Sequence, residues 1–135
     1  MLLSPAPPLL RLAALSALIA VVLGALGAHG SVHDVLASSG KLESWETGVR
    51  YQLPHSMFLY VLALFLGGAS KSARCGWLLL FYGTLLFSGS IYLLAYFKWT
   101  WLGPVTPLGG LLLMLGWLLL ALTKWKRTEF PTELR

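Results

Sequence analysis

Charged residues are scarce in this sequence. Lys, Arg, Asp and Glu make up 11% of its 135 residues, whereas soluble domains carry roughly 25%. Hydrophobic residues make up 57%, and a water-soluble fold of this size cannot cover so much apolar surface. A water-soluble globular protein is therefore excluded. A disordered chain is excluded as well, because disordered segments are poor in Leu, Val, Phe and Trp.

Cysteine and acidic residues are also few. The one cysteine, Cys75, excludes a disulfide framework and any metal site built from several thiolates. Five acidic residues against ten basic ones give a net charge of +5. In a membrane protein this excess reports topology, because Lys and Arg are retained on the cytoplasmic side. No basic run is interleaved with base-stacking aromatic residues, so we expect no nucleic-acid partner.

Long apolar stretches are abundant, and four of them approach the roughly 20 residues with which a helix crosses ~30 Å of hydrocarbon. Most connections between them are short, and short connections place consecutive helices side by side and antiparallel. The sequence predicts an all-α fold, an integral-membrane up-down four-helix bundle, with one transmembrane domain over residues 1–135. The expected spans are about 12–28, 45–69, 75–97 and 106–125.

Local signals indicate where some helices begin. Ser44 is the candidate cap of the second helix, with Glu46 in its first turn, and Thr106 followed by Pro107 suits the start of the fourth. We expect residues 70–74 to form a tight loop between the second and third helices.

The segment between the first two spans, residues 30–43, is more polar than the other connections. One interpretation is a short interfacial helix, because Val32, Val35 and Leu36 would share one of its faces. A solvated loop is the alternative.

Basic residues are unevenly distributed over the two sides of the expected bundle. The side that holds both termini and the loop at 70–74 would carry Arg11, Lys71, Arg74, Lys124, Lys126, Arg127 and Arg135. The opposite side would carry Lys41, Arg50 and Lys98. This asymmetry predicts a multi-pass membrane protein with both termini in the cytoplasm.

The first apolar stretch has two interpretations. Arg11, the apolar run and the small residues at 25–27 are compatible with a secretory signal and its cleavage site. The alternative is a retained helix, because small residues recur every four positions, as in membrane helices that pack closely. This ladder consists of Ser16, Ala20, Gly24 and Ala28.

Small residues also mark the expected helix contacts elsewhere, because membrane helices pack through close backbone approach. Gly76 and Gly83 lie seven apart in the third span, as do Gly109 and Gly116 in the fourth, and a seven-residue repeat gives left-handed crossings. The residues that we expect at packing contacts are Gly24, Gly27, Gly83, Gly89, Pro107, Gly109, Gly110 and Gly116.

Polar residues gather toward the external ends of the expected helices. The candidate cluster consists of His29, Thr47, Tyr51, Gln52, His55, Ser88, Ser90, Tyr92 and Thr106. One interpretation is a hydrogen-bonded packing cluster, and the other is a functional pocket. We expect His55 inside the bundle near the external face, bonded to Ser88, Ser90, Tyr92 or His29. Glu46 and Arg50 have the spacing of a helical ion pair.

Patterns of catalytic and metal sites are missing. His29, His33 and His55 lack the spacing of metal ligands, no serine lies in a nucleophile elbow, and no phosphate-binding loop occurs. We therefore expect no metal, no cofactor and no catalytic residue.

Two kinds of function remain after these exclusions. The first is a non-enzymatic accessory or structural component of the membrane, with the lipid bilayer and a membrane protein or second copy as partners. The alternative is a protein that handles a small solute, a lipid or protons through a polar pocket near the external face.

Four ordered blocks, residues 24–30, 47–55, 83–92 and 105–110, resemble the YgdD/YwdK-type family of small bacterial inner-membrane proteins of unknown function. The resemblance implies four spans and no established activity. By position, the family's polar motif residues would be His29, Tyr51, Gln52, His55, Ser88, Ser90, Tyr92, Thr106 and Pro107.

Overall fold

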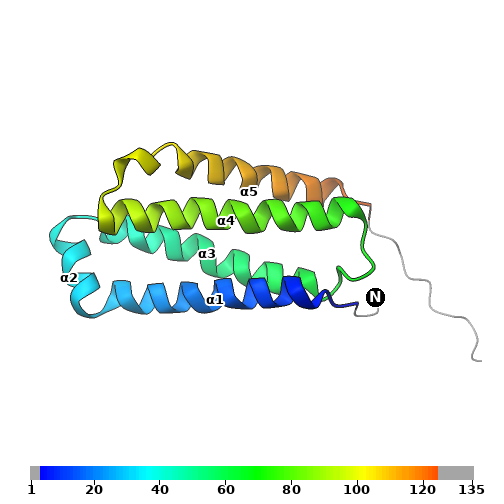
Figure 1. The fold of residues 1–135 in the computed structure, drawn as a ribbon, viewed down its shortest axis with the longest axis horizontal. Helices are drawn as coiled ribbons and strands as arrows, with labels where there is room; N and C mark the ends of the chain where they lie inside the picture. The colour runs from blue at the N-terminus through cyan, green and yellow to red at the C-terminus, as the bar shows by residue number, and fades with distance from the viewer. Residues whose placement is uncertain (1–3, 125–135) are drawn as a thin grey trace, which may run out of the picture.

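The protein is built from helices that run along one long axis (Figure 1). The structure, a computed structural model, describes residues 4–124. Its elements are α1 (Pro7–Ala28), α2 (Gly30–Ser38), α3 (Leu42–Ala63), α4 (Lys71–Phe97), the 3-10 helix η1 (Thr100–Leu102) and α5 (Val105–Leu122). The four long helices alternate in direction, which confirms the all-α up-down four-helix bundle. Trp125, Lys126, Arg127 and Arg135, which entered the span and topology predictions, lie outside the described residues.

The long helices pack in an open zigzag. The main contacts join α1 to α3, α3 to α4, and α4 to α5, so α3 and α4 form the centre of the bundle and α1 and α5 flank it. We call the end that carries α2 and η1 the α2 end, and the opposite end, where Ser4 and Thr123 lie, the terminal end (Figure 1).

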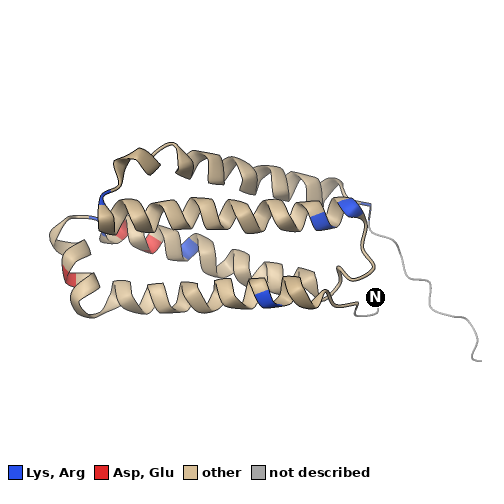
Figure 2. Ribbon diagram, in the orientation of Figure 1, with Lys and Arg blue, Asp and Glu red and all other residues tan. Residues whose placement is uncertain are grey.

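The surface of the bundle suits a hydrocarbon environment. α1, α4 and the segment Thr100–Leu122 are long and apolar enough to cross a membrane. α3 has a similar length but carries Glu43, Glu46 and Arg50 near its start. Figure 2 shows that charged residues lie mainly at the two ends and near the start of α3, while most of the helical surface is uncharged.

The start of α3 differs from the prediction. α3 begins at Leu42, so Ser44 lies inside its first turn, and no side chain caps the helix. The reason is a tight connection: Gly40 adopts a φ of +66°, which ends α2, and the Lys41 N–H donates to the Leu36 carbonyl at 2.8 Å. α3 also ends earlier than expected, at Ala63.

The starts of α4 and α5 differ as well. α4 already begins at Lys71, because Ser70 accepts a hydrogen bond from the Ala73 N–H; most of the expected loop at 70–74 is therefore helical. Arg74 donates to the carbonyls of Leu66 and Gly67 after α3. The other cap prediction is also wrong, since Thr106 lies inside α5 and its hydroxyl binds another helix.

The segment between the first two long helices forms a helix, α2, rather than a plain loop. Its buried residue is Leu36, and Val32 is half-buried against the same cluster. Val35 is 43% exposed, so it does not share the packed face that the sequence suggested.

The contact between α4 and α5 is a backbone-to-backbone seam. A Cβ atom added to Gly83 would lie 2.8 Å from the Leu113 nitrogen, and one added to Gly116 would meet Leu80. Gly109 lies directly against the backbone of Phe87. Such close approach strengthens dispersion contacts, which replace the hydrophobic effect between membrane helices.

Other residues that we expect at packing contacts are not tightly packed. Gly89 has no atom within 4 Å of a built Cβ, and Gly110 meets only the Phe87 ring at an ordinary distance. Pro107 is exposed. The contact prediction for Gly89 is therefore wrong, because no neighbouring helix comes close to its built Cβ. The prediction for Pro107 is wrong as well, because an exposed residue is not at a tight helix contact.

On α1, small residues line part of the contact with α3. The buried residues are Ala13, Ser16, Ala20 and Gly27, so the seam follows the helical repeat rather than a strict four-residue interval. Gly24 is half-buried against Val49, whereas Ala28 at the end of the ladder is exposed.

Candidate functional site

A chain of hydrogen bonds between buried side chains joins α1, α3 and α4. Gln52 of α3 is its centre: its Nε2 donates to the Ser16 carbonyl at 3.1 Å, and its Oε1 accepts from the Tyr92 hydroxyl at 3.0 Å. The hydroxyls of Ser16 and Ser56 lie 2.7 Å apart, and Ser56 also donates to the Gln52 carbonyl. All four side chains are almost fully buried, so these bonds satisfy groups that water cannot reach.

Two glycines make room for the aromatic residues beside this chain. A Cβ atom on Gly48, one turn before Gln52, would lie 2.6 Å from the Tyr92 ring. The ring therefore passes over Gly48 to reach the amide. Gly27 likewise accommodates the indole of Trp45, whose Nε1 donates to the Leu23 carbonyl at 2.8 Å.

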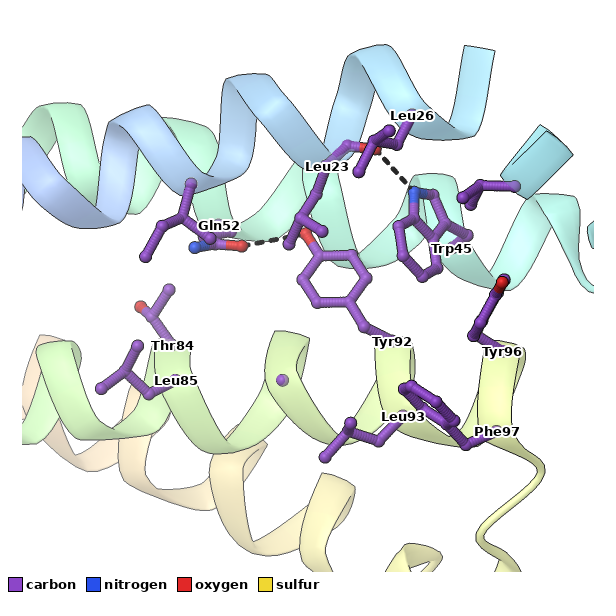
Figure 3. Close-up of a pocket in the computed structure, with 13 residues that line it drawn as sticks. Leu23, Leu26, Trp45, Gln52, Thr84, Leu85, Tyr92, Leu93, Tyr96 and Phe97 are labelled. Carbon is purple, nitrogen blue, oxygen red and sulfur yellow. Dashed lines mark hydrogen bonds between the residues drawn. The ribbon is translucent and has the colours of Figure 1, made fainter. Parts of the chain in front are cut away.

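A groove of about 520 Å³ opens between α1 and α4, with α3 as its floor (Figure 3). We call it the α1–α4 groove. It is lined by Ile19, Leu23, Leu26, Val32, Trp45, Gln52, Thr84, Leu85, Gly89, Tyr92, Leu93, Tyr96 and Phe97. In Figure 3 the bond between Gln52 and Tyr92 crosses the floor, and leucine side chains form much of the walls.

The polar groups of this groove are largely occupied by bonds within the protein. Gln52 and Tyr92 bind each other, the Trp45 indole binds Leu23, and the Thr84 hydroxyl donates to the Leu80 carbonyl at 2.7 Å. The groove consequently offers a mainly apolar surface to whatever enters it.

A second polar contact joins α4 to α5. The hydroxyls of Ser90 and Thr106 lie 2.7 Å apart, and Ser90 also donates to the Phe87 carbonyl. Ser88 is close by in the sequence and fully buried, and its Oγ is the one buried side-chain polar atom in residues 4–124 without a hydrogen-bond partner.

His55 binds another helix, but through a partner that the sequence did not indicate. Its Nδ1 lies 2.7 Å from the Tyr51 carbonyl, and its Nε2 accepts from the Trp117 indole of α5 at 3.2 Å. A carbonyl can only accept and an indole N–H can only donate, so this arrangement assigns Nδ1 as the donor and Nε2 as the acceptor. None of the expected partners, Ser88, Ser90, Tyr92 and His29, contributes, because this face of α3 is turned toward α5.

The remaining candidates are separate from one another. His29 lies exposed at the end of α1. The Thr47 hydroxyl donates to a carbonyl of its own helix, and the Tyr51 ring packs on Phe87 at a centroid distance of 4.6 Å. The nine predicted polar residues thus occupy several places on the bundle and do not form one cluster. The expected ion pair between Glu46 and Arg50 is present at 3.0 Å, exposed on the surface.

Sequence reasoning missed three members of these networks: Ser16, Ser56 and Trp117. Ser16 was interpreted only as a small packing residue. The available signal was its hydroxyl, since a hydroxyl in an apolar helix needs a partner on its own or another helix. Among the described residues no group of three or more His, Cys, Asp or Glu is placed to hold a metal.

Comparisons with known proteins give the chain relatives without a known activity. The model of a family described as protein of unknown function (DUF423) matches residues 23–110. A UPF0382 membrane protein of Haemophilus influenzae is 40% identical over 121 residues, which cover 87% of this chain and 93% of that protein. UPF0382 membrane protein YwdK of Bacillus subtilis is 39% identical over 88 residues, covering 63% and 71%. No solved structure matches the chain.

Proposed function

Since this chain belongs to the DUF423 family of membrane proteins of unknown function, we propose a role that its own geometry supports: non-enzymatic binding of a lipid hydrocarbon chain in the α1–α4 groove. The groove itself, about 520 Å³ with mainly apolar walls, is the observation that carries this proposal. The resemblance to the YwdK-type family is confirmed, but it supplies no activity.

Packing physics favours an apolar occupant. An empty apolar groove leaves its wall atoms without dispersion partners on one side, and lipid chains are the apolar molecules that surround a membrane protein. Leu23, Leu85 and Leu93 present side chains of the same character as such a chain.

The side chains that line the α1–α4 groove support a non-enzymatic role. Gln52, Tyr92, Trp45 and Thr84 already bind one another or the backbone. No carboxylate, imidazole, thiol or amine, the usual general bases and nucleophiles, lines the groove. The polar floor instead ties α1, α3 and α4 together, which preserves the shape of the groove.

The proposal also includes the membrane arrangement. We place α1, α3, α4 and α5 across the bacterial inner membrane, with the terminal end in the cytoplasm. The support is the distribution of Lys and Arg along the sequence. α3 enters this arrangement because Gln52 and Ser56 face other helices rather than lipid.

Gly89 provides a direct test. A Cβ built there meets nothing within 4 Å, and Gly89 lines the groove, so the ring of Gly89→Phe should occupy it. We expect native mass spectrometry of the purified protein to show fewer retained phospholipids, with unchanged thermal stability. Leu118→Phe, on a residue that is 56% exposed on α5, is the control and should retain them. Equal lipid retention by folded Gly89→Phe protein would contradict the proposal.

A second candidate function is an accessory protein that docks a transmembrane helix of a partner in the same groove. The observation that favours it is also Gly89, because an open glycine on a helix face permits close approach of another helix. Affinity purification in mild detergent separates the two. A stoichiometric membrane protein that is lost with Gly89→Phe would support docking of a helix instead of a lipid chain.

A further inference from the structure

The face opposite the α1–α4 groove has a hollow of a different character at the α2 end. Its volume is about 500 Å³, and its lining includes Lys41, Lys98, Ser44, Thr100 and Thr106. We call it the lysine pocket. No carboxylate lines it, and within residues 4–124 the single ion pair involves neither lysine. The pocket therefore combines two positive charges with several hydroxyl groups.

The backbone fixes both lysines at the mouth of this pocket. Lys41 directly follows the left-handed Gly40 and precedes the first residue of α3. Lys98 directly follows the last residue of α4 and is the one non-glycine among the described residues with a positive φ, 57°. The start of α3 lacks a side-chain cap, so its free N–H groups add positive potential there, although Glu43 offsets part of it.

A second, mainly apolar hollow of about 580 Å³ lies farther toward the middle of the bundle, lined by Tyr51, His55, Phe87, Trp117 and neighbours. Three pairs of residues eleven positions apart connect the linings of the two hollows along α3, α4 and α5: Ser44 and His55, Lys98 (directly after α4) and Phe87, and Thr106 and Trp117. Eleven residues are about three helical turns, so each pair shares a face and spans roughly 16 Å. That length is about half of the ~30 Å hydrocarbon core, the depth of one leaflet.

Aromatic residues indicate the depth of the lysine pocket in the membrane. The rings of Tyr96, Phe97, Trp99 and Trp101 follow one another at centroid distances of 5.1, 5.2 and 6.3 Å around Lys98. Tyr and Trp concentrate at the level of the lipid headgroups. The two lysines are thus at the height where a phospholipid carries its phosphate.

We propose that this face binds an anionic phospholipid. Lys41 and Lys98 bind the phosphate, the hydroxyls of Ser44 and Thr100 donate to its oxygens, and one acyl chain enters the apolar hollow beside Phe87. This site shares no lining residue with the α1–α4 groove. It does not rest on the function proposed for that groove, and either proposal can fail alone.

The test is a titration of the full-length protein in detergent, followed by native mass spectrometry and thermal unfolding. The probes are phosphatidylglycerol, phosphatidylcholine with the same chains, and inorganic phosphate. We expect phosphatidylglycerol to bind most tightly and Lys41→Gln/Lys98→Gln to weaken it roughly thirtyfold. Lys71→Gln/Lys124→Gln removes the same charge from exposed residues at the terminal end and should leave its binding unchanged.

Lys98→Gly keeps the test independent of folding. Glycine adopts a positive φ without the strain that lysine carries there, so this variant should unfold at the same or a higher temperature and still bind phosphatidylglycerol more weakly. Equal binding by wild type and the double variant would overturn the proposal, as would equal binding of phosphatidylcholine. Stabilisation by inorganic phosphate as strong as that by phosphatidylglycerol would assign the pocket to a free anion and overturn the lipid.

Discussion

At the scale of single residues, Gln52 has the most consequential environment. Its amide binds α1 through the Ser16 carbonyl and α4 through the Tyr92 hydroxyl, and its side chain is almost fully buried. A buried donor or acceptor that loses its partner costs about 1–3 kcal/mol. One side chain therefore holds three helices in register and forms the floor of the α1–α4 groove.

We predict that Tyr92→Phe lowers the free energy of unfolding by about 1 kcal/mol, because it leaves the Gln52 Oε1 without its donor. Gln52→Leu should cost more, since it also leaves the Ser16 carbonyl without its side-chain donor. The double variant should lose less than the sum of the two, because both partners of one bond are then removed. Thermal or denaturant unfolding in detergent measures all three.

Tyr82→Phe is the matched control for these variants, since Tyr82 is 55% exposed and should unfold as the wild type does. Strictly additive losses in the double variant would show that the contact between Gln52 and Tyr92 contributes nothing to stability.

At the scale of the elements, sequence patterns predicted helix existence well and helix ends poorly. The apolar stretches sufficed for the four long helices, because length and hydropathy do not depend on neighbours. The helix starts predicted from the capping residues Ser44 and Thr106 were wrong. Gly40 and Pro104 precede the actual starts of α3 and α5. Nor does a sequence give the rotation of a helix about its axis, so it did not show that His55 faces α5 while Gln52 faces α1 and α4.

The close contact between α4 and α5 should contribute measurably to the stability of the protein. Gly83→Leu should destabilise the protein by about 1–3 kcal/mol or more, because its Cβ would lie 2.8 Å from the backbone nitrogen of Leu113. Gly89→Leu on the same helix is the control, since nothing lies within 4 Å of its Cβ. The measurement is the unfolding temperature of the two variants in the same detergent. Similar temperatures for both would show that α4 and α5 do not touch along this seam.

At the scale of the whole molecule, the zigzag order of the helices explains why there are grooves at all. The main contacts run from α1 to α3, α3 to α4 and α4 to α5, whereas a closed bundle would also bring α1 against α5. One groove therefore opens on each face of the bundle. The α1–α4 groove lies over α3, and the hollow on the other face is lined by Phe87 of α4. The short connections predicted that consecutive helices lie side by side, and these contacts confirm it. They did not predict the open arrangement, because closure of a bundle depends on how each helix is rotated about its axis.

The orientation of the complete chain in the membrane can be predicted from its Lys and Arg residues. We expect reporter fusions at Arg135 and at residues 38–40 to lie in opposite compartments, with Arg135 in the cytoplasm, because Lys and Arg are concentrated at the terminal end and in the sequence that follows α5. A cytoplasmic signal from the 38–40 fusion, or an external signal from Arg135, would reverse the arrangement.

A structure of the protein in a phospholipid nanodisc would show whether the α1–α4 groove holds a lipid hydrocarbon chain. We expect elongated density along Leu23, Leu85 and Leu93, above an intact hydrogen bond between Gln52 and Tyr92. A groove closed by direct contact of α1 with α4, or filled by protein, would contradict it.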